Sequence, residues 1–251
     1  ARFVQVSTDE VFGSLALDDG AVFTEDTPFA PNSPYAAAKA GGDLLCRAYA
    51  RTHGTPVIVT HCSNNYGPYM FPEKLIPFAI LRALAGQPVP VYGDGKNVRD
   101  WVYVDDHATA LDCILRTGVP GETYGIGVNN ERSNLDVVGA ILDILGKPRS
   151  AMEFVADRPG HDRRYAIDAS KMTALGWAPE YDSDQFEIGL AETINWYLTN
   201  NEWVRNLWEK HDEAYKINHV PTFRKKQKEH EQSIIGEDIH IVDELSILFY
   251  E

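Results

Sequence analysis

The sequence has few cysteines, a shortage of basic residues and no long apolar run. Its three cysteines, Cys46, Cys62 and Cys113, lie far apart without a CxxC spacing. This predicts neither a disulfide framework nor a zinc site and is typical of a protein of the reducing cytoplasm. No run of about 18 apolar residues occurs, so we expect no transmembrane helix. The formal net charge of −14 argues against nucleic acid or an anionic membrane as the main partner, because such a field repels phosphates.

An α/β fold with a parallel sheet is predicted from the order of the elements. Residues 2–7 and 55–63 are apolar runs of strand length, and both are expected to be fully buried. The segment between them carries the signals of a helix over residues 33–54, with Ser33 as N-cap and Gly54 as the stop. Strand, helix and strand in this order predict a right-handed parallel crossover.

The same alternation continues to about residue 150. The expected elements are a loop over 14–32, helices over 72–85, 106–118 and 135–146, a turn at 93–95, and strands over 99–104 and 124–128. Asp105 and Asn134 precede two of these helices and are expected to cap them. Beyond residue 150 the sequence turns to short charged pieces and then to a helix around residues 185–208.

Asp9 and Glu10 stand side by side where the first expected strand ends, in the string VSTDEVFG. Neighbouring residues of a strand point to opposite faces, so the two carboxyls converge only if the chain leaves the strand there. Such strand ends are where ligands bind in open α/β sheets. Taken alone, the pair is also typical of a loop acid followed by a helix-cap acid.

Tyr35 and Lys39 are four residues apart on the expected 33–54 helix, so they share one face. A lysine ammonium at this distance favours the phenolate, which predicts a lowered pKa for Tyr35 and a role as a base near neutral pH. By itself, the spacing is also common in solvent-exposed pairs without a function.

These residues carry a resemblance. Ser7 and Thr8 at a strand end, followed by a helix with Tyr35 and Lys39, resemble the catalytic set of the extended short-chain dehydrogenase/reductase superfamily. Within it, the strings STDEVFG, CSNNYGPYMFPEKLIP, VYGDGKNVRDWVYVDDH and RPGHDRRYAID resemble those of the dTDP-glucose 4,6-dehydratase family. The likeness runs from residue 1 to about 208.

The resemblance implies a Rossmann-like fold and an NAD-dependent lyase that dehydrates a dTDP-sugar, usually as a homodimer. It implies that Tyr35 is the base at the 4-hydroxyl, that Thr8 hydrogen-bonds the same oxygen, and that Lys39 orients the nicotinamide ribose. Glu10 is then the base at carbon 5, and Asp9 is the acid at the 6-hydroxyl. Two neighbouring carboxyls raise at least one pKa of the pair, which suits different roles at one pH.

The remaining matches imply binding residues. Ser7 and Asn65, together with Tyr35 and Lys39, belong to the implied NAD site. The implied substrate-binding residues are Asn64, Lys74, Leu75, Pro90, Tyr92, Arg99, Asn134, Arg158 and His161. Asparagines after a strand are also common turn residues, and a helix cap explains the one at position 134 equally well.

Two arginines and the histidines have simpler interpretations. Arg163 and Arg164 fit either a diphosphate site or ordinary surface ion pairs. His61, His107 and His161 do not have the spacing of metal ligands, so we expect no metal and treat them as structural or hydrogen-bonding residues.

The sequence departs from the family at its start. A dinucleotide-binding half needs a glycine-rich turn after its first strand and an acidic residue about 20 positions later, and the sequence has neither. Its beginning resembles the middle of the nucleotide-binding sheet, and a sheet cut there is expected to expose an apolar edge. Either the chain is part of a longer dehydratase, or it cannot hold NAD by itself.

We therefore expect three regions. Residues 1–150 correspond to the C-terminal part of the NAD-binding domain, interleaved with substrate-binding segments. Residues 151–208 form a substrate-binding region, and residues 209–251 are a tail of unknown role. A sugar nucleotide 4-epimerase or decarboxylase shares the Thr, Tyr and Lys but has no use for the adjacent acids, and a non-catalytic interaction protein is the other alternative.

Overall fold

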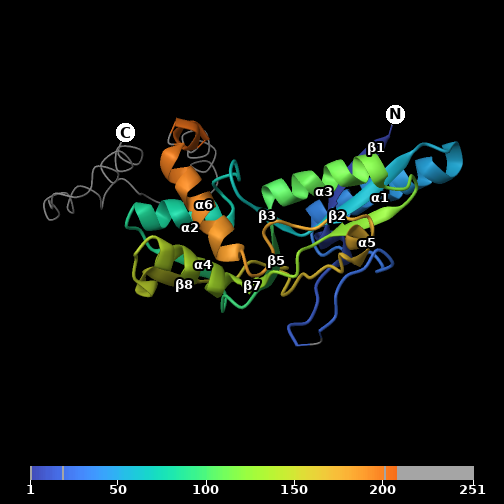
Figure 1. Cartoon of the computed structure of the whole chain (residues 1–251). Helices are drawn as coiled ribbons and strands as arrows, with labels where there is room; N and C mark the ends of the chain where they lie inside the picture. The colour runs from blue at the N-terminus through green and yellow to red at the C-terminus, as the bar shows by residue number, and fades with distance from the viewer. Residues whose placement is uncertain (1, 19, 201, 208–251) are drawn as a thin grey trace, which may run out of the picture.

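The computed structural model describes residues 2–18, 20–200 and 202–207 (Figure 1). The expected tail over 209–251 lies outside these residues. The elements are β1 (Phe3–Thr8), η1 (Asp9–Phe12), α1 (Pro34–His53), β2 (Val57–Cys62), β3 (Asn64–Tyr66), α2 (Leu75–Leu84), β4 (Val89–Tyr92), β5 (Val98–Tyr103), α3 (Val104–Thr117), β6 (Thr123–Ile126), β7 (Glu131–Ser133), α4 (Asn134–Ile144), η2 (Arg149–Ala151), β8 (Met152–Val155), α5 (Ser170–Ala174) and α6 (Phe186–Thr199). The expected α/β fold with parallel strands is confirmed.

The predicted crossover is confirmed in β1, α1 and β2. The Ser33 hydroxyl accepts a hydrogen bond from the Ala36 N–H at 3.1 Å and so caps α1. Gly54 ends the helix in the left-handed conformation, with φ at 63°, which a glycine adopts without steric cost. β1 and β2 run parallel, and β6 lies on the other side of β2, also parallel.

The prediction that β1 is fully buried is wrong. Phe3 is 52% exposed and Val6 is 42% exposed. β1 is an edge strand of the described β1–β2–β6 sheet, whereas all six residues of the central strand β2 are buried, as predicted. The apolar edge expected for this sheet is therefore present.

The second sheet, β3–β5–β7, lies between two groups of helices and strands (Figure 1). β3 pairs in parallel with β5, and β7 pairs antiparallel with β5. In Figure 1, α1, α3, β1 and β2 lie to one side of this sheet, and α2, α4, α6 and β8 lie to the other. A short parallel pair, β4 with β8, completes the latter side. β3, β4, β7 and β8 were not expected from the sequence.

Two helix starts differ from the prediction. Asp105 lies inside the first turn of α3, where Tyr103 takes the cap position without a side-chain hydrogen bond. Asn134 is the first residue of α4. Ser133 caps that helix in a reciprocal pair with Asp136, which satisfies two backbone donors at once.

Three buried apolar clusters support this arrangement. The largest packs α2, α4 and α6 together, and Trp196 and Trp203 pack against it. A second lies between α3 and the β2–β6 pair. The third lies beneath η1 and includes Val11 and Phe12, so the segment that carries the two acids rests on a packed base.

Candidate functional site

The chain leaves the strand at the acid pair. Thr8 is the N-cap of the 3-10 helix η1, and its hydroxyl accepts from the Glu10 N–H at 3.3 Å. Because the chain turns into a helix here, Asp9 and Glu10 do not point to opposite faces as neighbouring residues of a strand would. Gly13 then ends η1 with φ at 87°, and a Cβ there would lie 2.6 Å from the Ala30 carbonyl oxygen. Only glycine fits this exit.

Asp9 keeps its proton to unusually high pH. The side chain is 2% exposed, and burial, followed by the Glu10 carboxylate, raises its pKa from 3.8 to about 7. The positive charge of Arg99 and a hydrogen bond with the Ser63 side chain oppose this rise. The Thr8 hydroxyl lies 3.3 Å from Asp9 Oδ1. Asp9 therefore suits an acid that donates a proton near neutral pH.

Glu10 lies among cations. Burial raises its pKa, and the neighbouring Asp162 raises it further. Arg99, Lys74 and Arg158 lower it. Three of the predicted substrate-binding residues are therefore close enough to Glu10 to act on its charge, although they come from three separate segments of the chain.

Tyr35 faces the same acids, but its pKa differs from the prediction. Burial, Glu10 and Asp9 raise the Tyr35 pKa above its ordinary 10.0, so the predicted lowering is wrong in this structure. Lys39 does not contact the phenol; its Nζ donates to the Val6 carbonyl oxygen at 2.6 Å. The predicted grouping of Tyr35 with the acid pair is nonetheless present.

Two buried amide oxygens near these strand ends have no partner among the described residues. They are Asn64 Oδ1 and Asn65 Oδ1. The Asn65 amide nitrogen donates to the Ser63 carbonyl oxygen at 3.3 Å, which holds the side chain in place. Such unpaired oxygens are costly unless a ligand or water satisfies them. Ser7 differs, because its hydroxyl donates to Asp43 Oδ2 at 2.6 Å.

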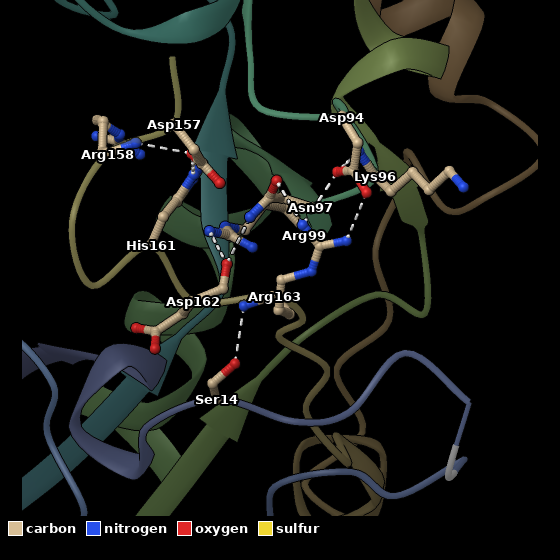
Figure 2. Close-up of polar contacts among 10 residues, drawn as sticks. All are labelled: Ser14, Asp94, Lys96, Asn97, Arg99, Asp157, Arg158, His161, Asp162 and Arg163. Carbon is tan, nitrogen blue, oxygen red and sulfur yellow. Dashed lines mark hydrogen bonds and ion pairs between the residues drawn. The ribbon is translucent and has the colours of Figure 1, made fainter.

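A polar network links β5 to residues 157–163 (Figure 2). Arg99 Nη2 and Asn97 Nδ2 both donate to the Asp162 carbonyl oxygen at 3.0 Å. The Arg99 guanidinium also lies over the Tyr165 ring, 4.1 Å from its centroid. Arg99 is 8% exposed. The hydrogen bond and the ring contact therefore fix the orientation of its buried guanidinium.

The same segment holds the other predicted residues of this region. His161 Nδ1 lies 2.6 Å from Asp157 Oδ1. Burial lowers the His161 pKa, and this outweighs the hydrogen bond with Asp157. Arg158 lies 5.5 Å from the ring centroid of Tyr92. In Figure 2 its side chain points away from the Arg99–Asp162 contact.

The remaining predicted residues lie at the starts of α2 and α4 and on β4. Lys74 pairs with Glu73 at the surface and precedes α2, whose first residue, Leu75, packs against the largest apolar cluster. Pro90 lies on β4. The Asn134 N–H donates to the Asn97 carbonyl oxygen, which joins the first residue of α4 to the residue that precedes β5.

Arg163 and Arg164 make ion pairs of different kinds. Arg163 pairs with Asp94 through both terminal nitrogens at the surface. Arg164 is 7% exposed and pairs bidentately with Glu131. Asp162 and Asn97 were missed by the sequence reasoning. The only signal for Asp162 is its place within the RPGHDRR string.

A cavity of about 940 Å³ lies elsewhere, lined by residues of α1 and β2 and of the segments 25–29 and 120–123. Its lining includes Asp43, His61 and Arg47, but not Thr8, Asp9, Glu10 or Tyr35. We place the candidate site at the strand ends and not in this cavity, because the perturbed carboxyls and unpaired polar atoms gather there. No group of three or more metal-binding side chains occurs within the described part of the chain. Nor does that part contain a helix both long and apolar enough to cross a bilayer.

The sequence is similar to curated enzymes over most of its length. It is 55% identical over 229 residues to a dTDP-glucose 4,6-dehydratase of Xanthomonas campestris pv. campestris (strain ATCC 33913), covering 87% of this chain and 63% of the relative. It is 52% identical over 221 residues to dTDP-glucose 4,6-dehydratase 1 of Escherichia coli strain K12, covering 82% and 60%. The chain therefore spans less than two thirds of these relatives.

Solved structures agree. A dTDP-glucose 4,6-dehydratase from Bacillus anthracis strain Ames, in complex with NAD, is 53% identical with a TM-score of 0.78, covering 82% of this chain and 64% of that one. A UDP-glucuronic acid 4-epimerase from Bacillus cereus is 27% identical with a TM-score of 0.72, covering 78% and 60%. These likenesses confirm the Rossmann-like α/β fold. The family model described as GDP-mannose 4,6-dehydratase matches residues 1–190, so the chain belongs to this family.

Proposed function

We propose that this protein acts as an NAD-dependent hydro-lyase that converts dTDP-glucose to dTDP-4-keto-6-deoxyglucose. The observation that carries the proposal is the pair of carboxyls at the end of β1, one fully buried with a pKa of about 7 and one surrounded by cations. The names of relatives at 52–55% identity support the substrate.

The residues of this chain divide the proton transfers among themselves. Tyr35 takes the proton of the 4-hydroxyl, and Thr8 hydrogen-bonds the same oxygen. NAD, held at its nicotinamide end by Tyr35 and Lys39, would supply the hydride-transfer chemistry at carbons 4 and 6. Because the 4-ketone makes the hydrogen on carbon 5 acidic, Glu10 can remove it, while Asp9 protonates the departing 6-hydroxyl.

The raised pKa of Tyr35 has a consequence for the first step. Asp9 and Glu10 disfavour the phenolate while they are charged. Protonation of Asp9 below about pH 7 removes one of these charges. The protonated acid thus serves both the first step and the elimination.

The described residues fit the nicotinamide end of NAD. Lys39 and Tyr35 lie along one face of α1 beside the end of β1. The unpaired buried Oδ1 of Asn65 is available to a polar group of the cofactor. We assign Ser7 to this site through its place before Thr8. The sequence holds no glycine-rich turn for the pyrophosphate.

The dTDP-sugar would bind between the acid pair and the network of Figure 2. Arg99 and Arg158 supply charged donors for the diphosphate. Tyr92 and His161 lie close to these arginines, and Lys74 lies close enough to Glu10 to act on its charge. The other assigned contacts are Asn64, Leu75, Pro90 and Asn134. We assign residues 151–208 mainly to this substrate-binding region and residues 1–150 mainly to the NAD-binding one.

We further propose a homodimer in the reducing cytoplasm that supplies deoxysugars such as rhamnose. The outer face of α1 exposes Leu45 to 63% and Tyr49 to 56%, which is the kind of apolar surface that a second copy can cover. The three free cysteines suit a reducing compartment.

An assay of product formation tests the reaction. Purified protein with NAD and dTDP-glucose should yield the 4-keto-6-deoxy product, identified by mass spectrometry. Glu10→Gln should still reduce NAD but give no elimination product, whereas the exposed control Glu153→Gln should match the wild type. Full product formation by Glu10→Gln would refute the assignment of the base. Inversion at carbon 4 without dehydration would instead identify a 4-epimerase, the activity named for the Bacillus cereus relative.

A further inference from the structure

Three buried polar side chains meet behind the candidate site. The Ser7 hydroxyl donates to Asp43 Oδ2 at 2.6 Å, and His61 Nε2 lies 3.2 Å from the same oxygen. All three are at most 6% exposed. Ser7 and His61 are direct partners in the β1–β2 register, so one carboxylate oxygen of α1 joins two neighbouring strands.

Asp43 belongs to a stripe on α1 that carries the catalytic groups. Tyr35, Lys39 and Asp43 are spaced by four residues, so they lie along one face of the helix. Lys39 Nζ donates to the Val6 carbonyl oxygen at 2.6 Å. The helix is thus attached to β1 at two consecutive residues, Val6 and Ser7, immediately before Thr8.

The same cluster reaches the acid pair through His61. Its ring packs edge-on against Phe12, with 4.7 Å between ring centroids, and against Phe29 at 5.7 Å. Phe12 is the last residue of η1. Because Asp9 and Glu10 belong to this short helix, a displacement of the His61 ring is transmitted to them by contact.

We propose that Asp43 is a positioning residue, whose carboxylate sets α1 against β1 and η1 so that Tyr35, Thr8 and the acid pair act on one sugar. The inference rests on the proposed function for its catalytic meaning. A buried carboxylate is not the cheapest way to pack a helix on a sheet, since an apolar residue avoids the desolvation cost. What the carboxylate adds is direction, because its oxygen accepts only from donors at defined places.

The kinetic test compares two buried carboxylates. Asp106 is 4% exposed and accepts from the Glu180 and Tyr181 N–H groups at 2.7 and 2.9 Å, so Asp106→Ala is the matched control for lost stability. At a temperature where both variants are folded, Asp43→Ala should lower kcat by about a hundredfold, because a small misplacement of reacting groups costs that much. The KM for dTDP-glucose should change by less than about twofold.

Conservative variants sharpen the comparison. Asp43→Asn keeps one acceptor oxygen and should retain more of kcat than Asp43→Ala, and Ser7→Ala should lower kcat with the same unchanged KM. Equal kcat values for Asp43→Ala and Asp106→Ala would overturn the proposal, as would a loss confined to KM.

A second readout does not depend on activity. The acid pair and burial raise the Tyr35 pKa above 10.0, so its titration, followed by carbon NMR of the labelled ring, reports where α1 lies relative to η1. Asp43→Ala should move the midpoint toward 10.0, and Asp106→Ala should not. If the wild type makes no product, the proposed function fails, but this titration still decides the positioning role: an unmoved midpoint overturns it.

Discussion

Replacing Asp9 by Asn tests the central feature of the site, a carboxyl that burial holds in its protonated form. The ordinary pKa of an aspartate carboxyl is 3.8, and the pKa of Asp9 in the folded protein is about 7. A folded pKa that is raised means that the folded state binds more protons than the unfolded one between these values. Stability is therefore lost as pH rises through this window. A difference of about three pKa units corresponds to about 4 kcal/mol when the loss is complete.

Asparagine has the same shape and does not ionise, so it removes this pH-dependent loss. Integrating the linkage relation between about pH 5 and about pH 8, we expect Asp9→Asn to gain about 2.5 kcal/mol of unfolding free energy relative to the wild type. Both proteins would be unfolded in urea at both pH values, and only the change with pH is compared, which cancels any fixed effect of the substitution.

The control is Asp112→Asn at an exposed carboxyl whose pKa is lowered by its hydrogen bond to Arg116. Its pH dependence should be small and of opposite sign. A gain for Asp9→Asn that is the same at both pH values would show that Asp9 ionises freely in the folded state, and the argument for an acid at this position would fail. In the enzyme assay the same variant should reduce NAD but release little 4-keto-6-deoxy product.

Arg99, Tyr35 and Ser33 give the remaining predictions. Arg99→Ala should weaken dTDP binding by about tenfold in calorimetry, because a charged hydrogen bond is lost, while the exposed Arg116→Ala should leave it unchanged. Tyr35→Phe should abolish NAD reduction by dTDP-glucose without weakening dTDP binding; retained reduction would exclude Tyr35 as the base. Ser33→Ala should lower the unfolding free energy by about 1 kcal/mol through the lost α1 cap, seen as a lower urea midpoint with an unchanged slope.

The sequence was sufficient for features that depend on local chemistry. Both ends of α1 lie where Ser33 and Gly54 predict them, because capping depends on a few neighbouring backbone groups. The parallel pairing of β1 with β2 follows from the order of the elements and the handedness of crossovers. The start of α4 was mispredicted because Ser133 forms a reciprocal cap with Asp136 that Asn134 does not form. α3 begins at Val104 without a side-chain cap, so Asp105 lies inside its first turn.

Features that depend on distant partners could not be predicted. The exposure of β1 follows from which strands lie beside it, not from its apolar residues. The pairing of Asn64–Tyr66 with β5 joins segments more than thirty residues apart. Asp43 carries no local signal at all. The predicted direction of the Tyr35 pKa considered only Lys39 on the same helix, whereas the acids of η1 and the burial of the ring determine it.

Asp9 and Glu10 are adjacent in one short helix, yet their surroundings favour the charged carboxylate to different degrees because η1 turns them in different directions. Asp9 faces the protein interior, where Arg99 and Ser63 only partly offset the cost of burying its charge. Glu10 faces Arg99, Lys74 and Arg158, which favour its carboxylate form. The same cations would hold the diphosphate of a bound nucleotide sugar and thereby share their charge with it. Substrate binding should then raise the pKa of Glu10 at the moment when a stronger base is needed, so the binding residues contribute to the basicity of the group that they surround.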